Sequence, residues 1–193
     1  MKNIIFDLGG VILKGKSSSV LDKLNTTKEE YNELINYFNN WEKLDIDECT
    51  IEEKFNSCNF SSTIENKYKD ILLKYYELRN INIELLDLIK ELKKNNKIYI
   101  LSDNNRNASL YYKNLFKDLD GYIFSYEYKT IKKDGKLFDI LLDKYNLNPK
   151  DCYFIDDSKE NIEVAISKNI NGHLYIDNET LYRYLKDNNI IGE

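Results

Sequence analysis

The stretch CYFIDDSKENIEVA, residues 152–165, places a short apolar run, two adjacent carboxylates and a helical pattern next to one another. Its first five residues have the length and composition of a buried strand. Ser158 is a suitable N-cap for a helix that carries Ile162 and Ala165 on one face. The stretch therefore predicts a strand that leads directly into a helix, which is the building unit of an α/β fold.

The same alternation continues along most of the chain. Strand-like apolar runs occur at residues 3–7, 97–101, 121–125, 152–156 and 172–176. Apolar residues at helical spacing lie between or after these runs, at residues 83–92, 137–145, 158–166 and 181–185. The pattern predicts an α/β, Rossmann-like core of three layers with a mainly parallel five-stranded sheet.

Residues 16–78 do not follow this alternation, because they show helical periodicity alone. We expect them to form a small all-helical insertion, and we expect residues 1–15 and 79–193 to form the core. Aromatic residues of the insertion are expected to pack inside it rather than to stack on a substrate. They are Tyr37, Trp41 and Phe55.

Composition excludes several classes of protein. The chain has 193 residues, with 28 Lys and Arg against 33 Asp and Glu, so its formal net charge is −5. An acidic chain disfavours nucleic-acid binding, and no stretch approaches the roughly 20 apolar residues of a membrane span. Three cysteines without a CxxC pair argue against a secreted disulfide framework. We therefore expect a cytoplasmic protein that binds neither nucleic acid nor membranes.

Polar residues follow four of the predicted strands, and ligands of open α/β sheets bind beyond the carboxyl ends of the strands. The residues at these ends are Asp7, Ser102, Asp103, Ser125, Asp156 and Asp157. Because the chain has a single histidine, His173, catalysis must rely on carboxylates, lysine, serine and backbone groups. The sequence thus concentrates its candidate chemistry at one edge of the sheet.

The adjacent carboxylates of Asp156 and Asp157 repel each other unless a cation or a shared proton relieves them. A cluster of oxygen ligands favours a hard ion such as Mg²⁺. The alternative is that Asp157 only caps the next helix together with Ser158. Ser102 and the backbone N–H groups after it are suited to phosphate oxygens, and the ammonium group of either Lys132 or Lys133 has the reach to join them.

The order Asp, Ser, Lys, Asp-Asp resembles the haloacid dehalogenase (HAD) superfamily of phosphohydrolases. FDLGGVIL, ILSDN, KKDGKLF and FIDDSKENIEVA resemble its first, second, third and fourth motifs. The most similar branch contains the epoxide-hydrolase-like amino-terminal phosphatases and the sugar-phosphate phosphatases. In that branch a helical cap is inserted between the first and second motifs, which is the place of residues 16–78 here.

The resemblance implies a Mg²⁺-dependent phosphatase that hydrolyses a small phosphorylated metabolite, such as a phosphosugar, through an aspartyl-phosphate. Asp7 would be the nucleophile, while Ser102 and Lys132 would bind the phosphate and stabilise the transition state. Asp103 would lie in the same phosphate site. Mg²⁺ would be held by ligands that the resemblance also names: Asp7, the Gly9 carbonyl and Asp157, with Asp156 as a direct or water-mediated neighbour.

Three positions depart from the family pattern. Gly9 stands where a second Asp usually serves as general acid and base, Lys133 stands where Pro is usual, and Asp103 stands where Asn is common. The loss at Gly9 motivates an alternative, a catalytically weak protein that binds a phosphorylated ligand or a partner protein. A metal-free dehalogenase is a third possibility, which the acidic pair disfavours. The sequence leaves the substrate and the oligomeric state open.

Overall fold

A computed structural model describes residues 1–192, and its centre is a five-stranded sheet with the strand order β3-β2-β1-β4-β5. All four neighbouring pairs are parallel. The strands are β1 (Asn3–Phe6), β2 (Lys97–Ser102), β3 (Gly121–Phe124), β4 (Cys152–Asp156) and β5 (Asn171–Leu174). The predicted Rossmann-like α/β fold with a parallel five-stranded sheet is confirmed.

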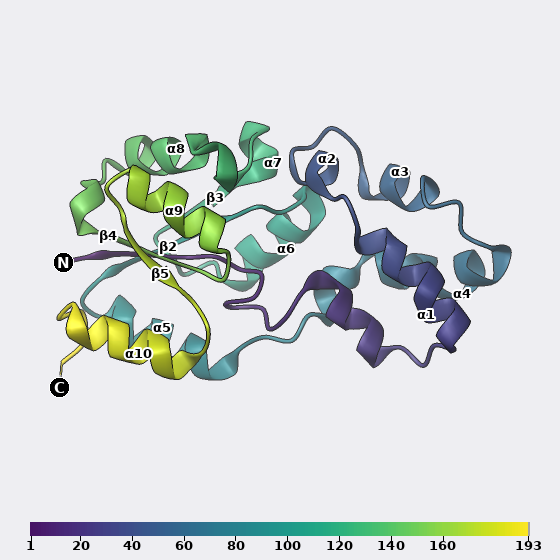
Figure 1. The fold of residues 1–193 in the computed structure, drawn as a ribbon, viewed down its shortest axis with the longest axis horizontal. Coiled ribbons are helices and arrows are strands. Elements are labelled where there is room, and N and C mark those ends of the chain that lie inside the picture. Colours follow the sequence, from purple (N-terminus) through teal and green to yellow (C-terminus); the bar gives the residue numbers. More distant parts are fainter. Residues whose placement is uncertain (193) are drawn as a thin grey trace.

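Helices cover both faces of this sheet, which gives three layers (Figure 1). One face packs against α5 (Ile83–Lys93), α6 (Arg106–Leu115) and α10 (Asn178–Asp187). The other face packs against α8 (Lys136–Tyr145) and α9 (Lys159–Ser167). Successive residues of a strand point to opposite faces of the sheet. Ile4 and Phe6 pack on the face covered by α5, α6 and α10, and Ile5 packs on the face covered by α8 and α9.

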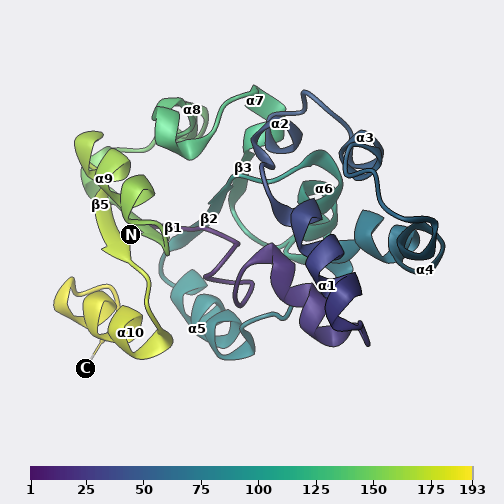
Figure 2. The same cartoon turned by 45° about the vertical axis from the view of Figure 1, so that its right-hand side comes forward.

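Residues 17–78 fold as helices only, and they lie beyond one end of the sheet (Figures 1 and 2). We call residues 16–78 the helical segment. Its α-helices are α1 (Lys28–Leu34), α2 (Glu42–Asp45), α3 (Ile51–Asn56) and α4 (Ser62–Leu73), and its 3₁₀ helices are η1 (Ser17–Lys23), η2 (Ile35–Phe38) and η3 (Tyr75–Leu78).

Aromatic side chains pack together with aliphatic ones, such as Leu34 and Leu72, in the interior of the helical segment. Tyr37 and Phe55 are completely buried, and their ring centroids lie 6.2 Å apart. Trp41 is half-buried, with its ring centroid 4.8 Å from that of Tyr75. These rings therefore pack on one another within the segment, as the sequence predicts for Tyr37, Trp41 and Phe55.

The two connections between the sheet and the helical segment run side by side. Lys14 N–H donates to Asn80 O over 2.8 Å, and Asn82 N–H donates to Ile12 O over 2.8 Å. The buried guanidinium of Arg79 donates to the carbonyls of residues 13–15. A paired backbone and one shared arginine thus fix the base of the segment.

Helix α6 is missing from the sequence prediction. Its buried positions are held by Ala108, Ser109 and Tyr112, which give a weaker apolar signal than the Leu and Ile of the predicted helices. The Asn105 side chain caps it by accepting a hydrogen bond from Ala108 N–H over 3.1 Å. The fifth predicted strand is also displaced: β5 ends at Leu174, although the apolar pattern continues to Ile176.

The remaining short elements are α7 (Ser125–Tyr128), η4 (Lys132–Asp134) and η5 (Pro149–Asp151). The three cysteines are free thiols. Within residues 1–192, every helix is too short or too polar to pass through a membrane.

Candidate active site

The order of the strands places a crevice at the carboxyl ends of β1 and β4. The chain proceeds from β1 to β2 and β3 on one side and then crosses to β4 and β5 on the other. Such a reversal of direction is where ligands bind in open α/β sheets. Asp7 follows β1 directly, Asp156 ends β4, and Asp7 N–H donates to Ile155 O over 2.9 Å.

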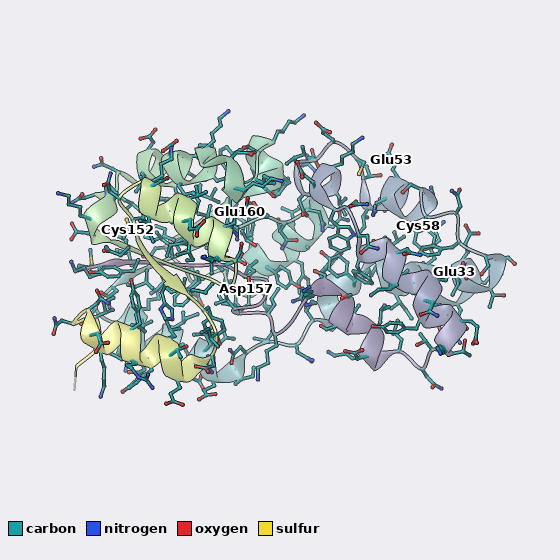
Figure 3. The ribbon with its side chains drawn as sticks, in the orientation of Figure 1. Glu33, Glu53, Cys58, Cys152, Asp157 and Glu160 are labelled. Carbon is teal, nitrogen blue, oxygen red and sulfur yellow. The ribbon has the colours of Figure 1, made fainter. Side chains whose placement is uncertain are left out.

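Three carboxylates converge in this crevice. Asp7, Asp156 and Asp157 each offer an oxygen atom, and these three atoms all lie within 4.8 Å of one another. Asp7 and Asp156 are buried and Asp157 is exposed. Figure 3 shows Asp157 at the end of the sheet that faces the helical segment. The convergence that the sequence predicts for Asp7 and the acidic pair is therefore present.

Lys132 is the cation of the site. Its Nζ atom lies 2.8 Å from Asp7 Oδ1 and 2.6 Å from Asp156 Oδ2, and only 2% of the residue is exposed. Lys133 instead lies at the surface, where it pairs with Glu42 over 3.2 Å. Of the two lysines that the sequence leaves open, Lys132 is thus the one beside the carboxylates.

The Asp156 carboxylate is occupied by hydrogen bonds. Besides Lys132, it accepts from Ser158 N–H over 2.7 Å and from Asn161 Nδ2, 3.2 Å from Oδ1 and 3.1 Å from Oδ2. With both oxygens engaged, Asp156 orients Lys132 and has little capacity for a direct metal bond. Sequence reasoning missed Asn161, although its place in the first turn of α9, five residues after Asp156, was an available signal.

The charges in the crevice do not balance without a further cation. One ammonium faces three carboxylates, so the fully ionised set carries 1 − 3 = −2. Burial raises the pKa of Asp7 to about 7. The nearby charge of Lys132 offsets this rise only in part, and the charge of Asp156 adds to it. A divalent cation held by oxygen atoms fits both the charge and the donor type.

The same imbalance acts on Lys132 in the opposite sense. Burial alone would lower its pKa, but the charges of Asp7, Asp156 and Asp103 outweigh burial, so the pKa of Lys132 is raised. The ammonium is therefore permanently charged, and the excess negative charge resides on the carboxylates. Burial also raises the pKa of Asp157, and the charge of Asp156 adds to this effect.

Two glycines after Asp7 have different surroundings. Gly10 has φ +75°, and a Cβ atom there would lie 2.0 Å from Asp157 Oδ2, so only glycine lets that carboxylate approach the loop. A Cβ atom at Gly9 would meet no atom of residues 1–192 within 4 Å. Gly9 lies in the turn beside the crevice, and its carbonyl as a metal ligand stays a prediction.

The predicted phosphate site lies at the end of β2. Ser102 is 2% exposed, and its hydroxyl forms no hydrogen bond with any described residue. The Asp103 carboxylate accepts a hydrogen bond from Lys132 N–H over 2.9 Å, and so it fixes the turn that carries Lys132. Burial raises the pKa of Asp103. A contact between Asp103 and phosphate stays a prediction.

Ser125, the polar residue after β3, binds backbone groups. Its Oγ accepts from Asn104 N–H over 2.9 Å and donates to Asp45 O over 2.6 Å. The hydroxyl therefore joins the sheet edge to the helical segment. Nearby, Arg106 binds Asp47 through two hydrogen bonds of 3.0 and 2.6 Å.

A sequence profile described as haloacid dehalogenase-like hydrolase matches residues 1–167. The chain belongs to this family. A search of curated proteins found no match.

Solved structures share the fold of this HAD-like hydrolase. A HAD family enzyme from Bacteroides thetaiotaomicron, in complex with magnesium and inorganic phosphate, has 20% sequence identity and a TM-score of 0.72, covering 95% of this chain and 100% of that chain. A predicted HAD-like family hydrolase from Porphyromonas gingivalis has 17% identity and a TM-score of 0.71, covering 96% and 98%. A putative beta-phosphoglucomutase from Thermotoga maritima has 21% identity and a TM-score of 0.58, covering 95% and 91%.

The HAD-like hydrolase has one carboxylate near the candidate site that sequence reasoning missed. Asp45, the last residue of α2, is half-buried in the helical segment. Burial raises its pKa to about 8, and the charge of Asp103 contributes to the rise. Nothing in the sequence marks Asp45, because it lies in a polar turn that has no motif and is remote from the four motifs along the chain.

Proposed function

We propose that this HAD-like hydrolase is a Mg²⁺-dependent phosphatase that hydrolyses a small phosphorylated metabolite, a phosphosugar or a similar phosphomonoester, through an aspartyl-phosphate. The observation that carries the proposal is the position of the Asp7 carboxylate. It lies 2.8 Å from the Lys132 ammonium and within 4.8 Å of Asp157. The residues that we propose as nucleophile, phosphate-binding cation and metal ligands are thus adjacent.

The residues present fit Mg²⁺. Asp7 and Asp157 would hold it through carboxylate oxygens, together with the Gly9 carbonyl, and Asp156 would support them from behind. When bound, Mg²⁺ offsets the repulsion between the Asp7 carboxylate and the phosphate dianion. The related Bacteroides enzyme, solved with magnesium and inorganic phosphate, supports this assignment.

The reaction itself uses groups of this chain. An Asp7 oxygen attacks the phosphorus atom, and the bond from phosphorus to the leaving oxygen breaks. Lys132 Nζ and the Ser102 hydroxyl donate to the non-bridging oxygens and stabilise the charge of the transition state. Asp156 holds Lys132 from behind over 2.6 Å. Water then cleaves the aspartyl-phosphate and restores Asp7.

We propose that residues 16–78 act as a cap on a core formed by residues 1–15 and 79–193. The segment lies over the carboxyl edge of the sheet (Figure 1). Two surface ion pairs, Asp47 with Arg106 and Glu42 with Lys133, join it to the loops that carry the candidate site. A cap in this position would exclude water from the site and select the substrate.

The test is a panel of phosphate esters, including p-nitrophenyl phosphate and phosphosugars, incubated with the pure protein with and without Mg²⁺. We expect hydrolysis only with Mg²⁺. We expect the Asp7→Asn variant to lose roughly 10⁴-fold or more in turnover, since it removes the nucleophile. The matched control is Asp70→Asn on the exposed face of α4, which should retain full activity.

A second function is favoured by one observation, the absence of a side chain at Gly9. A protein that binds a phosphorylated ligand without turnover would bind vanadate or BeF₃⁻ with Mg²⁺ but release no phosphate from the panel. That outcome would replace the phosphatase proposal. Halide release from haloacids without metal would instead indicate a dehalogenase, for which the acidic cluster has no use.

A further inference from the structure

Phosphate ester hydrolysis needs a group that gives a proton to the leaving oxygen, and position 9 has no side chain to do so. The carboxylates at the sheet edge are otherwise engaged. Asp156 accepts four hydrogen bonds from three residues, one oxygen of Asp103 accepts from Lys132 N–H, and Asp157 belongs to the metal cluster. Asp103 keeps one oxygen free, so the candidates for the missing group are Asp103 and a carboxyl group from outside the sheet edge.

Asp45 approaches the crevice from the helical segment. Its backbone oxygen accepts the 2.6 Å hydrogen bond from Ser125 Oγ, and Ser125 also holds Asn104 N–H over 2.9 Å. The last residue of α2 is therefore fixed against the loop that follows β2 and begins at Asp103. The Asp45 carboxylate is half-buried and forms no hydrogen bond or ion pair with any residue from 1 to 192.

The neighbouring carboxylates of the same segment differ from Asp45. Glu42 pairs with Lys133 over 3.2 Å, and Asp47 pairs with Arg106 at 2.6 Å. These two pairs flank Asp45 and fix the segment without consuming its carboxylate. Among these three acidic residues, Asp45 alone is left to act on a ligand.

Several charged and titratable groups face Asp45. They are Asp103 from the loop after β2, Lys132 from η4, Glu42 from its own helix and the hydroxyl of the buried Tyr75. Burial raises the pKa of Asp45 to about 8, with Asp103 raising it further and Lys132 opposing the rise. A carboxyl group in these surroundings keeps its proton at neutral pH, as a general acid requires.

We propose that Asp45 is the general acid and base of the reaction and that it takes the place of the side chain absent at Gly9. This inference rests on the proposed phosphatase function. As the Asp7 oxygen bonds to phosphorus and the phosphorus bond to the leaving oxygen breaks, the Asp45 carboxyl gives its proton to that oxygen. The products are the free alcohol, the aspartyl-phosphate and the Asp45 carboxylate.

The second half of the reaction restores both residues. The Asp45 carboxylate removes a proton from water, and the water oxygen bonds to phosphorus. The bond between phosphorus and the Asp7 oxygen breaks, which releases inorganic phosphate and the Asp7 carboxylate. The proton taken from water stays on Asp45, which is thereby restored to its starting form without any further reactant.

Leaving-group dependence tests the proposal. With Mg²⁺ present, Asp45→Asn should lower kcat for alkyl phosphates by about 10² to 10⁴-fold. With p-nitrophenyl phosphate, whose leaving group needs no proton, the first step should persist. A burst of one nitrophenolate per enzyme should then precede a slow phase, because the base for water is missing. The control is Glu48→Gln, an exposed carboxylate three residues away, which should behave like the wild type.

The open space at Gly9 allows a rescue experiment. Gly9→Asp introduces a carboxylate at a position where a Cβ atom would meet no atom of residues 1–192 within 4 Å. The double variant should therefore hydrolyse alkyl phosphates at least about 10-fold faster than Asp45→Asn alone. Equal losses for both leaving groups without a burst, or no loss at all, would overturn the role of Asp45. If the wild-type protein hydrolyses no ester, the proposed function itself fails, which is a distinct result.

Discussion

The carboxyl edge of the sheet and the helical segment bury different kinds of side chain. At the edge, Asp7, Lys132 and Asp156 are buried, charged and bound to one another. In the helical segment, the large buried side chains are apolar or aromatic, such as Leu34, Tyr37 and Phe55. The edge is thus built to hold charge in fixed positions, whereas the segment is built to hold its own shape.

This difference separates the expected effects of mutation. Changes at the edge should alter the chemical step, metal affinity and stability together, because each charge there compensates another. Changes on the surface of the helical segment should alter how the segment meets the edge, and so they should change KM or substrate preference. The predictions below compare the two regions, from the largest expected effect to the smallest.

Replacement of Lys132 should have the largest effect. Lys132→Met leaves Asp7 and Asp156 buried without their cation, which should cost about 3 kcal/mol of unfolding free energy at pH 8. Turnover should fall roughly 10² to 10³-fold, because the transition state loses a charged donor. Urea unfolding and phosphate release measure both effects.

Lys133→Met is the matched control, since Lys133 is the adjacent lysine in an exposed pair with Glu42. It should cost less than about 1 kcal/mol and leave turnover nearly unchanged. Equal effects of the two substitutions would contradict the assignment of Lys132 as the cation of the site. The difference should also shrink at pH 5, where Asp7 is free to take a proton.

The pH dependence of stability should reveal the uncompensated charge at the edge. Burial raises the folded-state pKa of Asp7 to about 7, whereas its usual value is 3.8. Between pH 3.8 and about pH 7 the folded state therefore binds more protons than the unfolded state. The stabilising effect of the bound proton is lost as the pH rises through this range. The metal-free protein should lose about 2 kcal/mol of stability from pH 5 to pH 8 through this group.

Mg²⁺ should reverse this loss. Mg²⁺ binding requires an ionised Asp7. Mg²⁺ at about 5 mM should therefore raise Tm more at pH 8 than at pH 5. Asp7→Asn should abolish both the pH-dependent loss in the metal-free protein and most of the Mg²⁺ effect. Thermal unfolding at both pH values measures these shifts, and an equal Mg²⁺ effect at both pH values in the wild type would contradict the charge balance described for the crevice.

The sheet and the charged edge were largely accessible to sequence reasoning. Strands β1 and β4 are short apolar runs; Asp7 follows the first directly and Asp156 ends the second, so both the pattern and the chemistry are local along the chain. Because the carboxyl ends of parallel strands share one edge, the approach of Asp7 to the acidic pair followed from the fold class alone. The backbone positions of these residues are set by the strands, and the sequence pattern defines the strands.

Other parts of the site depend on packing that has no local signal. The position of Asp45 depends on contacts between distant parts of the chain, such as the hydrogen bond from Ser125, 80 residues away, to its backbone. The choice between Lys132 and Lys133 depends on the turn of η4, which directs one side chain inward and the next outward. Helix α6 was missed for a related reason, since its buried face uses small and tyrosine side chains.

The two glycines of the first motif give a smaller, local comparison. Gly10→Ala forces a side chain onto a positive φ and into the Asp157 carboxylate. It should cost roughly 1 to 2 kcal/mol of stability and weaken Mg²⁺ binding by about 10-fold, as loss of ligand positioning does. Calorimetric titration with Mg²⁺ measures the affinity.

Gly9→Ala provides the control, because a Cβ atom there meets no atom of residues 1–192 within 4 Å. It should leave Mg²⁺ affinity within about 2-fold of the wild type, which is the scale of a surface change. If both substitutions weaken Mg²⁺ equally, the approach of Asp157 to Gly10 has no part in forming the metal site.

The smallest expected effect belongs to the contact between the two regions. Arg106 and Asp47 form an exposed ion pair, so Arg106→Met should cost less than about 1 kcal/mol of stability. The same pair fixes the segment that carries Asp45, and so its loss should favour an open arrangement and raise KM about 2 to 5-fold with kcat unchanged.

The control for this prediction is Lys90→Met on α5. It removes another exposed pair, with Asp87, and should leave KM unchanged. Added salt should raise the KM of the wild type toward that of Arg106→Met, because salt screens an exposed pair. A KM that does not respond to salt or to Arg106→Met would mean that the segment holds its position without this pair, through Ser125 and the aromatic interior alone.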